Sequence, residues 1–221
     1  MVNWIGGLVI VAFVLVPSAS GCGAMSKVDL WRLITSGRDG YQRPEMVIDA
    51  LDVRSGATVA EIGAGEGYWL PWLSKAVGKE GKVYAVEVEA DDVERLRQLV
   101  DDEGLGNVQV VFGRYEDPLL PDGSVDLAIT SKTYHHIEER VAYFRRLRAD
   151  LAPRGRVAHL DDRPGLPFPL SWITAGHTSD PAMIEKEMTE AGYRRLAEFD
   201  FIYPQSFLVY GPVGAPAGEE D

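Results

Sequence analysis

The chain of 221 residues is 46% hydrophobic and 25% charged, an ordinary globular composition with enough length for one domain that has its own core. Its 22 Lys and Arg against 34 Asp and Glu give a net charge of −12, and a surface this acidic repels the phosphate backbone of nucleic acid. The densest basic group falls on an expected helix and is interpreted as a solvated face: Arg140, Arg145, Arg146 and Arg148.

The N-terminal segment, residues 1–24, differs from everything after it. No charged residue precedes Lys27, and the apolar run from Trp4 to Val16 is short for a bilayer span but fits the core of a signal peptide. Small residues then lead into Cys22, the only cysteine, as they do at the lipidation site of bacterial lipoproteins. We therefore expect a membrane-anchored lipoprotein on the periplasmic or exterior face. The alternative is a true start at Met25, which leaves a cytoplasmic protein.

From Thr58 onward, short apolar runs alternate with longer helical patterns, which predicts a parallel sheet flanked by helices. We expect strands at 58–62, 83–86, 108–112, 125–130 and 156–160, and helices at 68–77, from 91, at 139–151 and at 181–191. Residues 194–201 and 205–210 predict an antiparallel hairpin. The expected fold is one α/β domain over residues 25–212, with a mostly parallel seven-stranded sheet and helices on both faces. A disordered acidic tail is expected at 213–221.

A glycine-rich turn between the first strand and the first helix carries the strongest chemical signal: Glu61-Ile62-Gly63-Ala64-Gly65-Glu66-Gly67. Glycines allow a sharp turn and close approach of a ligand to the backbone, and the helix N-terminus behind them offers free N–H groups. The spacing is G-x-G-x-G, whereas dinucleotide enzymes usually have G-x-G-x-x-G. The carboxylate of Glu61 suits a cationic amino acid group better than a pyrophosphate.

Glu87 ends the second expected strand, about 20 residues beyond the glycines, where a carboxylate can accept hydrogen bonds from both hydroxyls of a ribose. The alternative is a solvated acid at a strand end. The preceding glycine turn favours ribose binding.

The order of these motifs resembles the class I S-adenosylmethionine-dependent methyltransferases, especially the small enzymes similar to the ubiquinone/menaquinone biosynthesis methyltransferases. The resemblance runs from about Arg38 to Tyr210. It implies a Rossmann-like methyltransferase fold, S-adenosylmethionine as cofactor, and methyl transfer to a small-molecule acceptor mainly by positioning donor and acceptor.

The same resemblance implies which residues bind the cofactor: Glu61, Gly63, Ala64, Gly65, Gly67, Glu87, Val88, Tyr115, Glu116 and Ser131. One position departs from the family pattern, which often has an acid for the adenine after the glycine of the third strand. Here that residue is Arg114, which has no acceptor atom. We expect Glu116 or Asp117 to take over, or backbone and apolar contacts to hold the adenine.

The segment after the fourth strand is where the resemblance places the methyl group and the acceptor. A base is needed only if the acceptor is protonated when it attacks, and the candidates are His135 and Tyr134, with His136 behind them. Alternatively, one histidine caps the next helix and the tyrosine packs on the cofactor. His159 and Asp161 would share one strand face without a defined third ligand, so no metal site is predicted.

Two other functions fit parts of the sequence. A nicotinamide- or flavin-dependent oxidoreductase has a similar fold but fits the glycine spacing poorly. A non-catalytic lipoprotein would keep the fold as a binding module, because an exported enzyme would find little of a cytoplasmic cofactor. We expect the proline-rich stretch around Phe168 and Trp172 to cover the site as a lid. The sequence indicates no oligomeric state.

Overall fold

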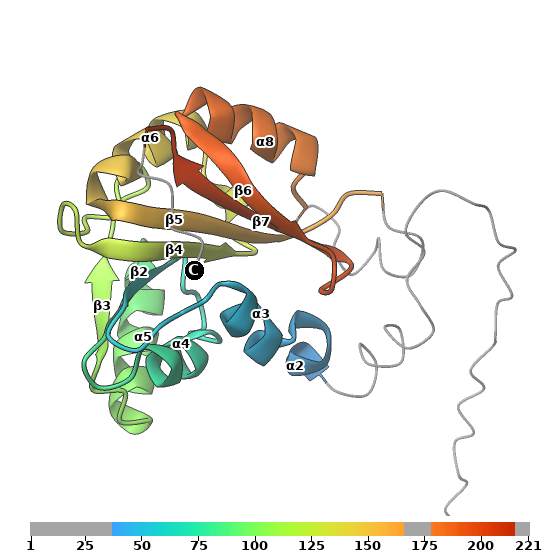
Figure 1. Ribbon diagram of the computed structural model, residues 1–221. Coiled ribbons are helices and arrows are strands. Elements are labelled where there is room, and N and C mark those ends of the chain that lie inside the picture. Colours follow the sequence, from blue (N-terminus) through green and yellow to red (C-terminus); the bar gives the residue numbers. More distant parts are fainter. Residues whose placement is uncertain (1–36, 166–177, 215–221) are drawn as a thin grey trace, which may run out of the picture.

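The computed structural model describes residues 37–165 and 178–214, which form a seven-stranded sheet with helices on both faces (Figure 1). The strand order is β3-β2-β1-β4-β5-β7-β6, with β7 antiparallel to both neighbours and the other pairs parallel. The strands are β1 (Thr58–Ile62), β2 (Lys82–Glu87), β3 (Val108–Phe112), β4 (Val125–Ser131), β5 (Leu151–Asp162), β6 (Tyr193–Phe199) and β7 (Gln205–Pro212). This confirms the predicted Rossmann-like sheet with its C-terminal antiparallel hairpin.

The helices divide between the two faces of the sheet (Figure 1). One face carries α3 (Pro44–Ala50), α4 (Leu70–Val77) and α5 (Ala90–Asp102), and the other carries α6 (Arg140–Asp150) and α8 (Pro181–Glu190). The short α2 (Gly37–Gln42) precedes α3, and a 3-10 turn, η1 (Tyr134–His136), follows β4.

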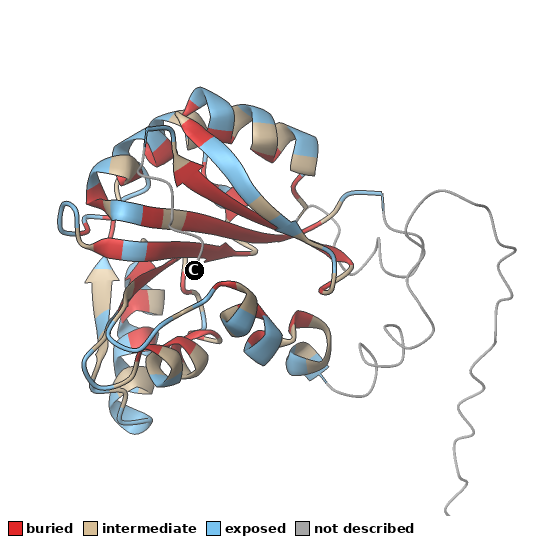
Figure 2. Cartoon of the chain, viewed as in Figure 1, coloured by how far each residue is buried: buried red, intermediate tan, exposed pale blue. Residues whose placement is uncertain are grey.

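The two faces bury separate hydrophobic clusters, because successive side chains of a strand point to opposite sides of a sheet. On β1, Val59 packs in the cluster that includes α3, α4 and α5, whereas Ala60 belongs to the cluster with α6 and α8. The central strands are buried on both faces, which explains their continuous apolar sequences (Figure 2). Glu61 and Glu87 are therefore buried carboxylates within apolar strands.

The fifth strand is longer than the sequence predicted. We expected a turn at Pro153-Arg154-Gly155 and a strand starting at Arg156, but Leu151 already pairs with Val125. The pairing register between β4 and β5 shifts after Val125, as at a β-bulge. This irregularity lets Pro153 lie within an extended strand. At its other end β5 continues to Asp162, because β7 pairs with it as far as Gln205.

The sheet order reverses between β1 and β4, which lie side by side although α4, β2, α5 and β3 separate them in the chain. In open α/β sheets ligands bind at such a point, in the crevice at the carboxyl ends of the strands. The ends of β1, β2 and β4 therefore mark the place to look for a site.

Several expectations concern residues outside the described ranges: the segment with Cys22, the stretch around Phe168 and Trp172, and nearly all of the tail at 213–221. Within residues 37–165 and 178–214, no helix has the length and apolar character that crossing a bilayer requires.

Candidate active site

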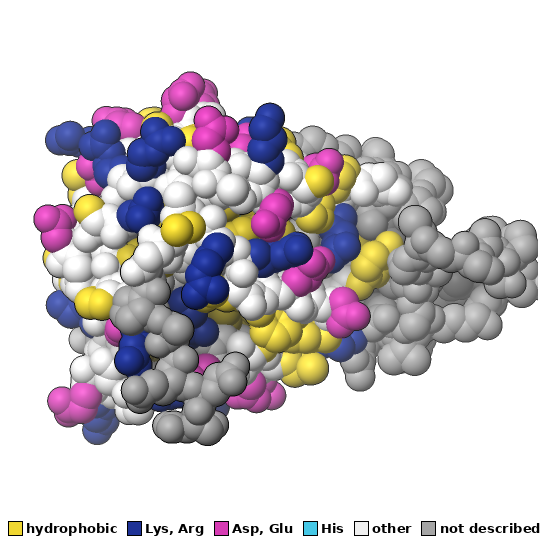
Figure 3. All heavy atoms as spheres, turned by 45° about the horizontal axis from the view of Figure 1, so that its top comes forward, with side chains coloured by type: hydrophobic (Ala, Val, Ile, Leu, Met, Phe, Trp, Pro, Cys, Tyr) yellow, Lys and Arg dark blue, Asp and Glu magenta, His cyan; other side chains and the backbone are white. Residues whose placement is uncertain are grey.

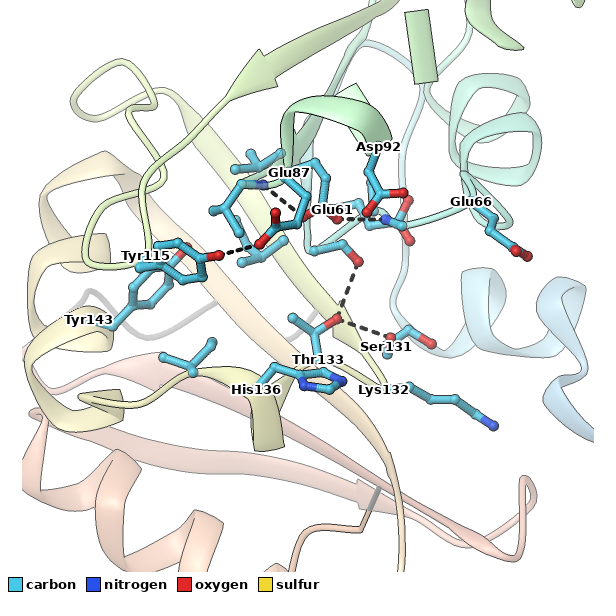
Figure 4. A pocket seen from close by; sticks show the side chains of 18 of the residues that line it. Glu61, Glu66, Glu87, Asp92, Tyr115, Ser131, Lys132, Thr133, His136 and Tyr143 are labelled. Atoms are coloured by element: carbon cyan, nitrogen blue, oxygen red, sulfur yellow. Dashed lines mark hydrogen bonds between the residues drawn. The ribbon is translucent and has the colours of Figure 1, made fainter. Parts of the chain in front are cut away.

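A cavity of about 560 Å³ lies at the carboxyl ends of β1, β2 and β4 (Figure 4). That volume falls in the range of about 300–1,000 Å³ that small ligands occupy. The walls come from α2, the glycine turn and the segments that follow β2, β3 and β4. The lining residues are Arg38, Glu61, Ile62, Gly63, Ala64, Gly65, Glu66, Val86, Glu87, Val88, Glu89, Asp92, Arg114, Tyr115, Ser131, Lys132, Thr133, His136, Ile137 and Tyr143.

The glycine turn needs its glycines for two different reasons. Gly63 has φ 70°, and a Cβ there would lie 2.3 Å from Cγ2 of Thr133, whose hydroxyl donates to the Gly63 carbonyl at 3.2 Å. A side chain is thus excluded both by the backbone conformation and by the segment after β4. Gly65 has φ 53° and no atom within 4 Å of the Cβ position, so open space lies beside its backbone. A ligand can lie against that bare turn.

Gly67, which we predicted to bind the cofactor, does not line the cavity. A Cβ on Gly67 would lie 2.4 Å from Cδ2 of Leu99 and 3.1 Å from Cδ2 of Leu96, both on α5. The absent side chain therefore lets α5 pack against the turn, and the role of Gly67 is in packing.

Glu87 is held by backbone donors at both of its carboxylate oxygens. Oε2 accepts from the N–H of Gly65 at 2.9 Å, and Oε1 accepts from the N–H of Val88 at 2.7 Å. A carboxylate offers about four lone-pair sites, so each oxygen can still accept from one ribose hydroxyl. This geometry supports the ribose-binding role predicted for Glu87.

Glu61 is 2% exposed, and its Oε2 has no hydrogen-bond partner among the described residues. Burial raises the pKa of Glu61 to about 8, with the positive charge of Arg38 opposing this and the negative charge of Glu87 adding to it. A buried oxygen without a hydrogen-bond donor lowers the stability of the fold, unless a bound ligand supplies the donor. A cationic amino group, such as that of S-adenosylmethionine, would supply both the missing donor and the missing charge.

The part of the cavity expected to hold the adenine lacks the acidic residues that the sequence predicted for it. Tyr115 lines the cavity, and its hydroxyl donates to the carboxylate of Glu89; Arg114 lines it as well. Glu116, predicted as a cofactor contact, is absent from the lining, and so is Asp117.

Asp117 is engaged elsewhere: its carboxylate accepts from the backbone N–H of Leu119 at 2.9 Å and pairs with Arg146 at 3.2 Å. Ile137 and Tyr143 contribute apolar surface to the cavity. Of the options left open by the sequence, the structure favours backbone and apolar contacts for the adenine.

Tyr134 does not line the cavity. It is fully buried, its ring stacks on Phe144 with centroids 5.5 Å apart, and its hydroxyl donates to Glu187 of α8 at 2.7 Å. Burial, followed by this bond to Glu187, raises the pKa of the phenol above its ordinary value. Tyr134 therefore anchors α8 to the segment after β4, and this placement corrects its assignment as a catalytic residue.

The sequence favours His135 over His136 as the candidate base, and the structure places them the other way round relative to the cavity. His136 lines the cavity, whereas His135 lies outside the lining, with Nδ1 3.0 Å from Oδ1 of the buried Asp161. The two imidazoles are adjacent, with ring centroids 4.1 Å apart. Of the two histidines, His136 therefore faces the cavity, and His135 is paired with Asp161 beside it.

His159 belongs to the core. Its Nδ1 is hydrogen-bonded to Oγ1 of Thr130 at 2.8 Å, and the rings of Tyr134, Phe144 and Tyr210 surround it. Burial lowers the pKa of His159 to about 3, so the imidazole is neutral at ordinary pH. Across residues 37–165 and 178–214, no three His, Cys, Asp or Glu side chains gather as a metal site would need.

The cavity brings together most of the cofactor residues that we predicted: Glu61, Gly63, Ala64, Gly65, Glu87, Val88, Tyr115 and Ser131. It also adds residues that sequence reasoning missed, above all Arg38, Lys132 and Thr133. Lys132 and Thr133 follow β4 directly, and their place after a strand end was an available signal. Arg38 comes from α2, and no local pattern connects it to the glycine turn.

Comparisons with known proteins point to methyltransferases. The family described as methyltransferase domain matches residues 59–155. The ubiquinone/menaquinone biosynthesis C-methyltransferase UbiE of Vibrio campbellii is 26% identical over 190 residues, which cover 84% of this chain and 73% of that protein. The structure of a SAM-dependent methyltransferase from Aquifex aeolicus has a TM-score of 0.66 and 29% identity, covering 76% of this chain and 87% of that one.

The fold is that of a Rossmann-like methyltransferase domain. Residues 59–155 match the methyltransferase domain family, and over most of its length the chain is similar to class I S-adenosylmethionine-dependent methyltransferases. This assignment overturns the oxidoreductase alternative. The fold alone would not have decided the matter, since the [4+2]-cyclase SpnF has the same fold at a TM-score of 0.64 and 14% identity.

The chain spans only part of some curated relatives. It covers 32% of an uncharacterised protein from a Streptomyces fradiae transposon and 47% of a protein-L-isoaspartate O-methyltransferase of Ignicoccus hospitalis. The acceptor is consequently a matter for proposal.

Proposed function

We propose that this protein transfers the methyl group of S-adenosylmethionine to a small-molecule acceptor, mainly by holding donor and acceptor in position. The observation that carries the proposal is the pairing of two buried carboxylates in one cavity: Glu61 with an orphaned oxygen and Glu87 with both oxygens fixed beside the glycine turn. These two carboxylate acceptors match a ligand that carries an ammonium group and ribose hydroxyls as donors.

Each residue has a distinct part in this proposal. Glu61 binds the amino group of the cofactor, Glu87 binds the ribose hydroxyls, and the backbone beside Gly65 accommodates the chain between them. When bound, S-adenosylmethionine supplies a methyl group already activated by a positively charged sulfur, so positioning provides much of the acceleration. His136, at the cavity wall, accepts the proton of an acceptor that is protonated when it reacts.

A small molecule is favoured as acceptor over a macromolecule. The relative from Vibrio campbellii, which matches over most of both chains, is named for quinone biosynthesis. On the face shown in Figure 3, Lys and Arg side chains are interspersed with Asp and Glu side chains. Of the basic helix residues noted in the sequence, Arg140 pairs with Glu187 and Arg146 pairs with Asp117. A surface of paired charges offers nucleic acid no continuous basic track.

The test is calorimetric titration of the full-length protein with S-adenosylmethionine, S-adenosylhomocysteine and NAD. We expect both adenosyl sulfur compounds to bind and NAD not to bind. A methyl-transfer panel then compares small phenols and quinols with RNA and protein acceptors. Binding of NAD alone would refute the cofactor assignment, and efficient methylation of RNA would refute the acceptor class.

We also propose that the full chain is anchored to a membrane through lipidated Cys22. The support is the uncharged apolar run at Trp4 to Val16 and the small residues before this cysteine. Acyl chains would hold the protein at a membrane, since each buried methylene contributes about 0.8 kcal/mol.

Location is tested by labelling cells that express the parent or Cys22→Ser with a fatty-acid analogue and then fractionating them. A labelled, membrane-bound parent beside an unlabelled variant supports the anchor. If both proteins are soluble and unlabelled and begin at Met25, the protein is cytoplasmic and the anchor proposal is wrong.

A further inference from the structure

The segment after β4 carries two charged or titratable cavity residues that are not assigned to the cofactor, Lys132 and His136. The carboxylates assigned to the cofactor, Glu61 and Glu87, come from β1 and β2. Figure 4 shows Lys132 and His136 on the other side of the cavity from these two carboxylates. Because His136 is the base of the proposed reaction, the side of the cavity that holds Lys132 is the side of the acceptor.

The backbone of Lys132 has a conformation that residues other than glycine seldom adopt. Its φ is 57°, and its N–H donates to the carbonyl of Leu160 at 2.9 Å, so the sheet fixes the residue in place. Successive side chains of a regular strand point to opposite faces, but the left-handed conformation ends this alternation, and both Ser131 and Lys132 line the cavity. Strained residues of this kind are concentrated at binding and catalytic sites.

Two consecutive acids at the end of β5 hold this segment. The buried Asp162 pairs with Nζ of Lys132 at 3.1 Å. The buried Asp161 lies 3.0 Å from Nδ1 of His135 and accepts from the N–H of Tyr134 at 3.2 Å. Since neighbouring residues of a strand point to opposite faces, the two carboxylates hold the segment from both sides of the sheet. The ammonium group is thus positioned before any ligand binds.

The ammonium group of Lys132 keeps a donor for a ligand. Among the described residues its partners are Asp162 and the side chain of Tyr41, whose ring centroid lies 5.3 Å from Nζ. An ammonium group has three N–H donors, so one remains, and the side chain is 34% exposed. Burial disfavours the charged form, but the negative charge of Asp162 and the contact with Tyr41 outweigh this and raise the pKa of Lys132. Lys132 is therefore a lasting positive charge on the cavity wall.

The other cations of the cavity lining, Arg38 and Arg114, belong to different parts of the wall. The positive charge of Arg38 acts on Glu61, where it opposes the burial that raises the pKa of this carboxyl. Arg114 adjoins Tyr115, which Figure 4 shows across the cavity from Lys132. Lys132 is thus the cation that shares a segment with His136.

We propose that the methyl acceptor carries a carboxylate, which the ammonium group of Lys132 binds while the accepting atom lies beside His136. This rests on the proposed methyl transfer, and it makes Lys132 a specificity residue for the acceptor. A carboxylate accepts a charge-assisted hydrogen bond from an ammonium group, and an uncharged group of the same shape accepts a weaker one. Because Lys132 and His136 are held on one segment, the acceptor must carry its carboxylate at a set distance from the reacting atom.

Matched acids and amides test this proposal in the full-length protein saturated with S-adenosylhomocysteine, which fills the place of the cofactor. The probes are benzoate, 4-hydroxybenzoate and phenylacetate, each beside its primary amide, which has nearly the same shape without the charge. We expect at least one acid to bind about 10- to 100-fold more tightly than its amide in calorimetry, the scale of one charge-assisted interaction. Lys132→Met should reduce this preference to less than about twofold and leave binding of the amide unchanged.

Asp162→Asn separates binding by Lys132 from a purely structural role of the ion pair. If the pair only ties the segment after β4 to β5, Asp162→Asn and Lys132→Met should affect the probes in the same way. If Lys132 binds the acceptor, Asp162→Asn keeps the preference for the acid, because the ammonium group remains. The matched charge control is Lys75→Met, at an exposed position of α4 outside the cavity lining, which should leave every affinity unchanged.

The affinity for S-adenosylhomocysteine, measured with the same variants, separates this proposal from the proposed function. An unchanged affinity in Lys132→Met shows that the variant is folded and that the lysine does not serve the cofactor. A reduced affinity assigns Lys132 to the cofactor and refutes the proposal. The proposal is also wrong if no acid is preferred to its amide, or if Lys132→Met keeps the preference. If the parent does not bind S-adenosylhomocysteine, the proposed cofactor is wrong and the acceptor subsite falls with it.

Discussion

Replacing Glu61 with glutamine should stabilise the ligand-free protein while it weakens the binding of the cofactor. The carboxyl of Glu61 is buried with one oxygen unpartnered, and burial raises its pKa from an ordinary 4.5 to about 8. Glutamine has nearly the same shape but cannot ionise. The variant therefore removes the cost of a buried acid and, with it, the charge that binds an ammonium group.

The sign and size of the effect follow from proton linkage. Between pH 4.5 and about 8 the unfolded chain has released the proton of Glu61 while the folded chain keeps it, so stability falls as pH rises through this window. The slope reaches about 1.4 kcal/mol per pH unit, which accumulates to about 3 kcal/mol at pH 7. Glu61→Gln should recover about that amount at pH 7 and almost none at pH 4.5.

Denaturant unfolding of parent and variant at half-unit steps from pH 4.5 to 8 measures this difference. Calorimetry adds an independent readout, because an ammonium ligand should drive Glu61 to ionise and release about one proton at pH 7. Titrations in buffers of different ionisation enthalpy count that proton, and Glu61→Gln should release none. A stability difference that stays constant across the pH range would refute the reasoning.

The remaining predictions concern the glycine turn, the ribose carboxylate and the acceptor side. Gly63→Ala should cost about 2–4 kcal/mol in denaturant unfolding, because its Cβ collides with Thr133 at a positive φ, whereas Gly104→Ala, with φ 64° and open space around it, should cost only about 1 kcal/mol; equal costs would contradict the steric argument. Glu87→Ala should weaken both S-adenosylhomocysteine and 5′-methylthioadenosine by about 1–3 kcal/mol in calorimetry, since both ligands carry the ribose, and unchanged binding would remove the ribose assignment. His136→Asn should lower kcat for a protonated acceptor about 10²- to 10⁴-fold with little change in S-adenosylhomocysteine affinity, and full activity would show that no base is supplied at this position.

Local sequence patterns predicted the scaffold well because the scaffold depends on local periodicity. The bounds of β1 and β3 match the expected 58–62 and 108–112, and the C-terminal hairpin is present. The start of β5 was wrong, because a proline and a glycine normally indicate a turn. Pairing of Leu151 with Val125, and a shifted register beyond it, overrode that preference.

By itself, the sequence determined the family, the sheet, the glycine turn and the carboxylates at Glu61 and Glu87, because each of these follows from residues close together in the chain. The tertiary structure decided which neighbours reach the cavity. His135 and His136 both lie on a 3-10 turn, where successive side chains point about 120° apart, so only the orientation of η1 on the sheet could choose between them. Arg38 shows the same limit at longer range: it lines the same cavity as the glycine turn because α2 and the end of β1 lie close together in space, and no spacing along the chain predicts this.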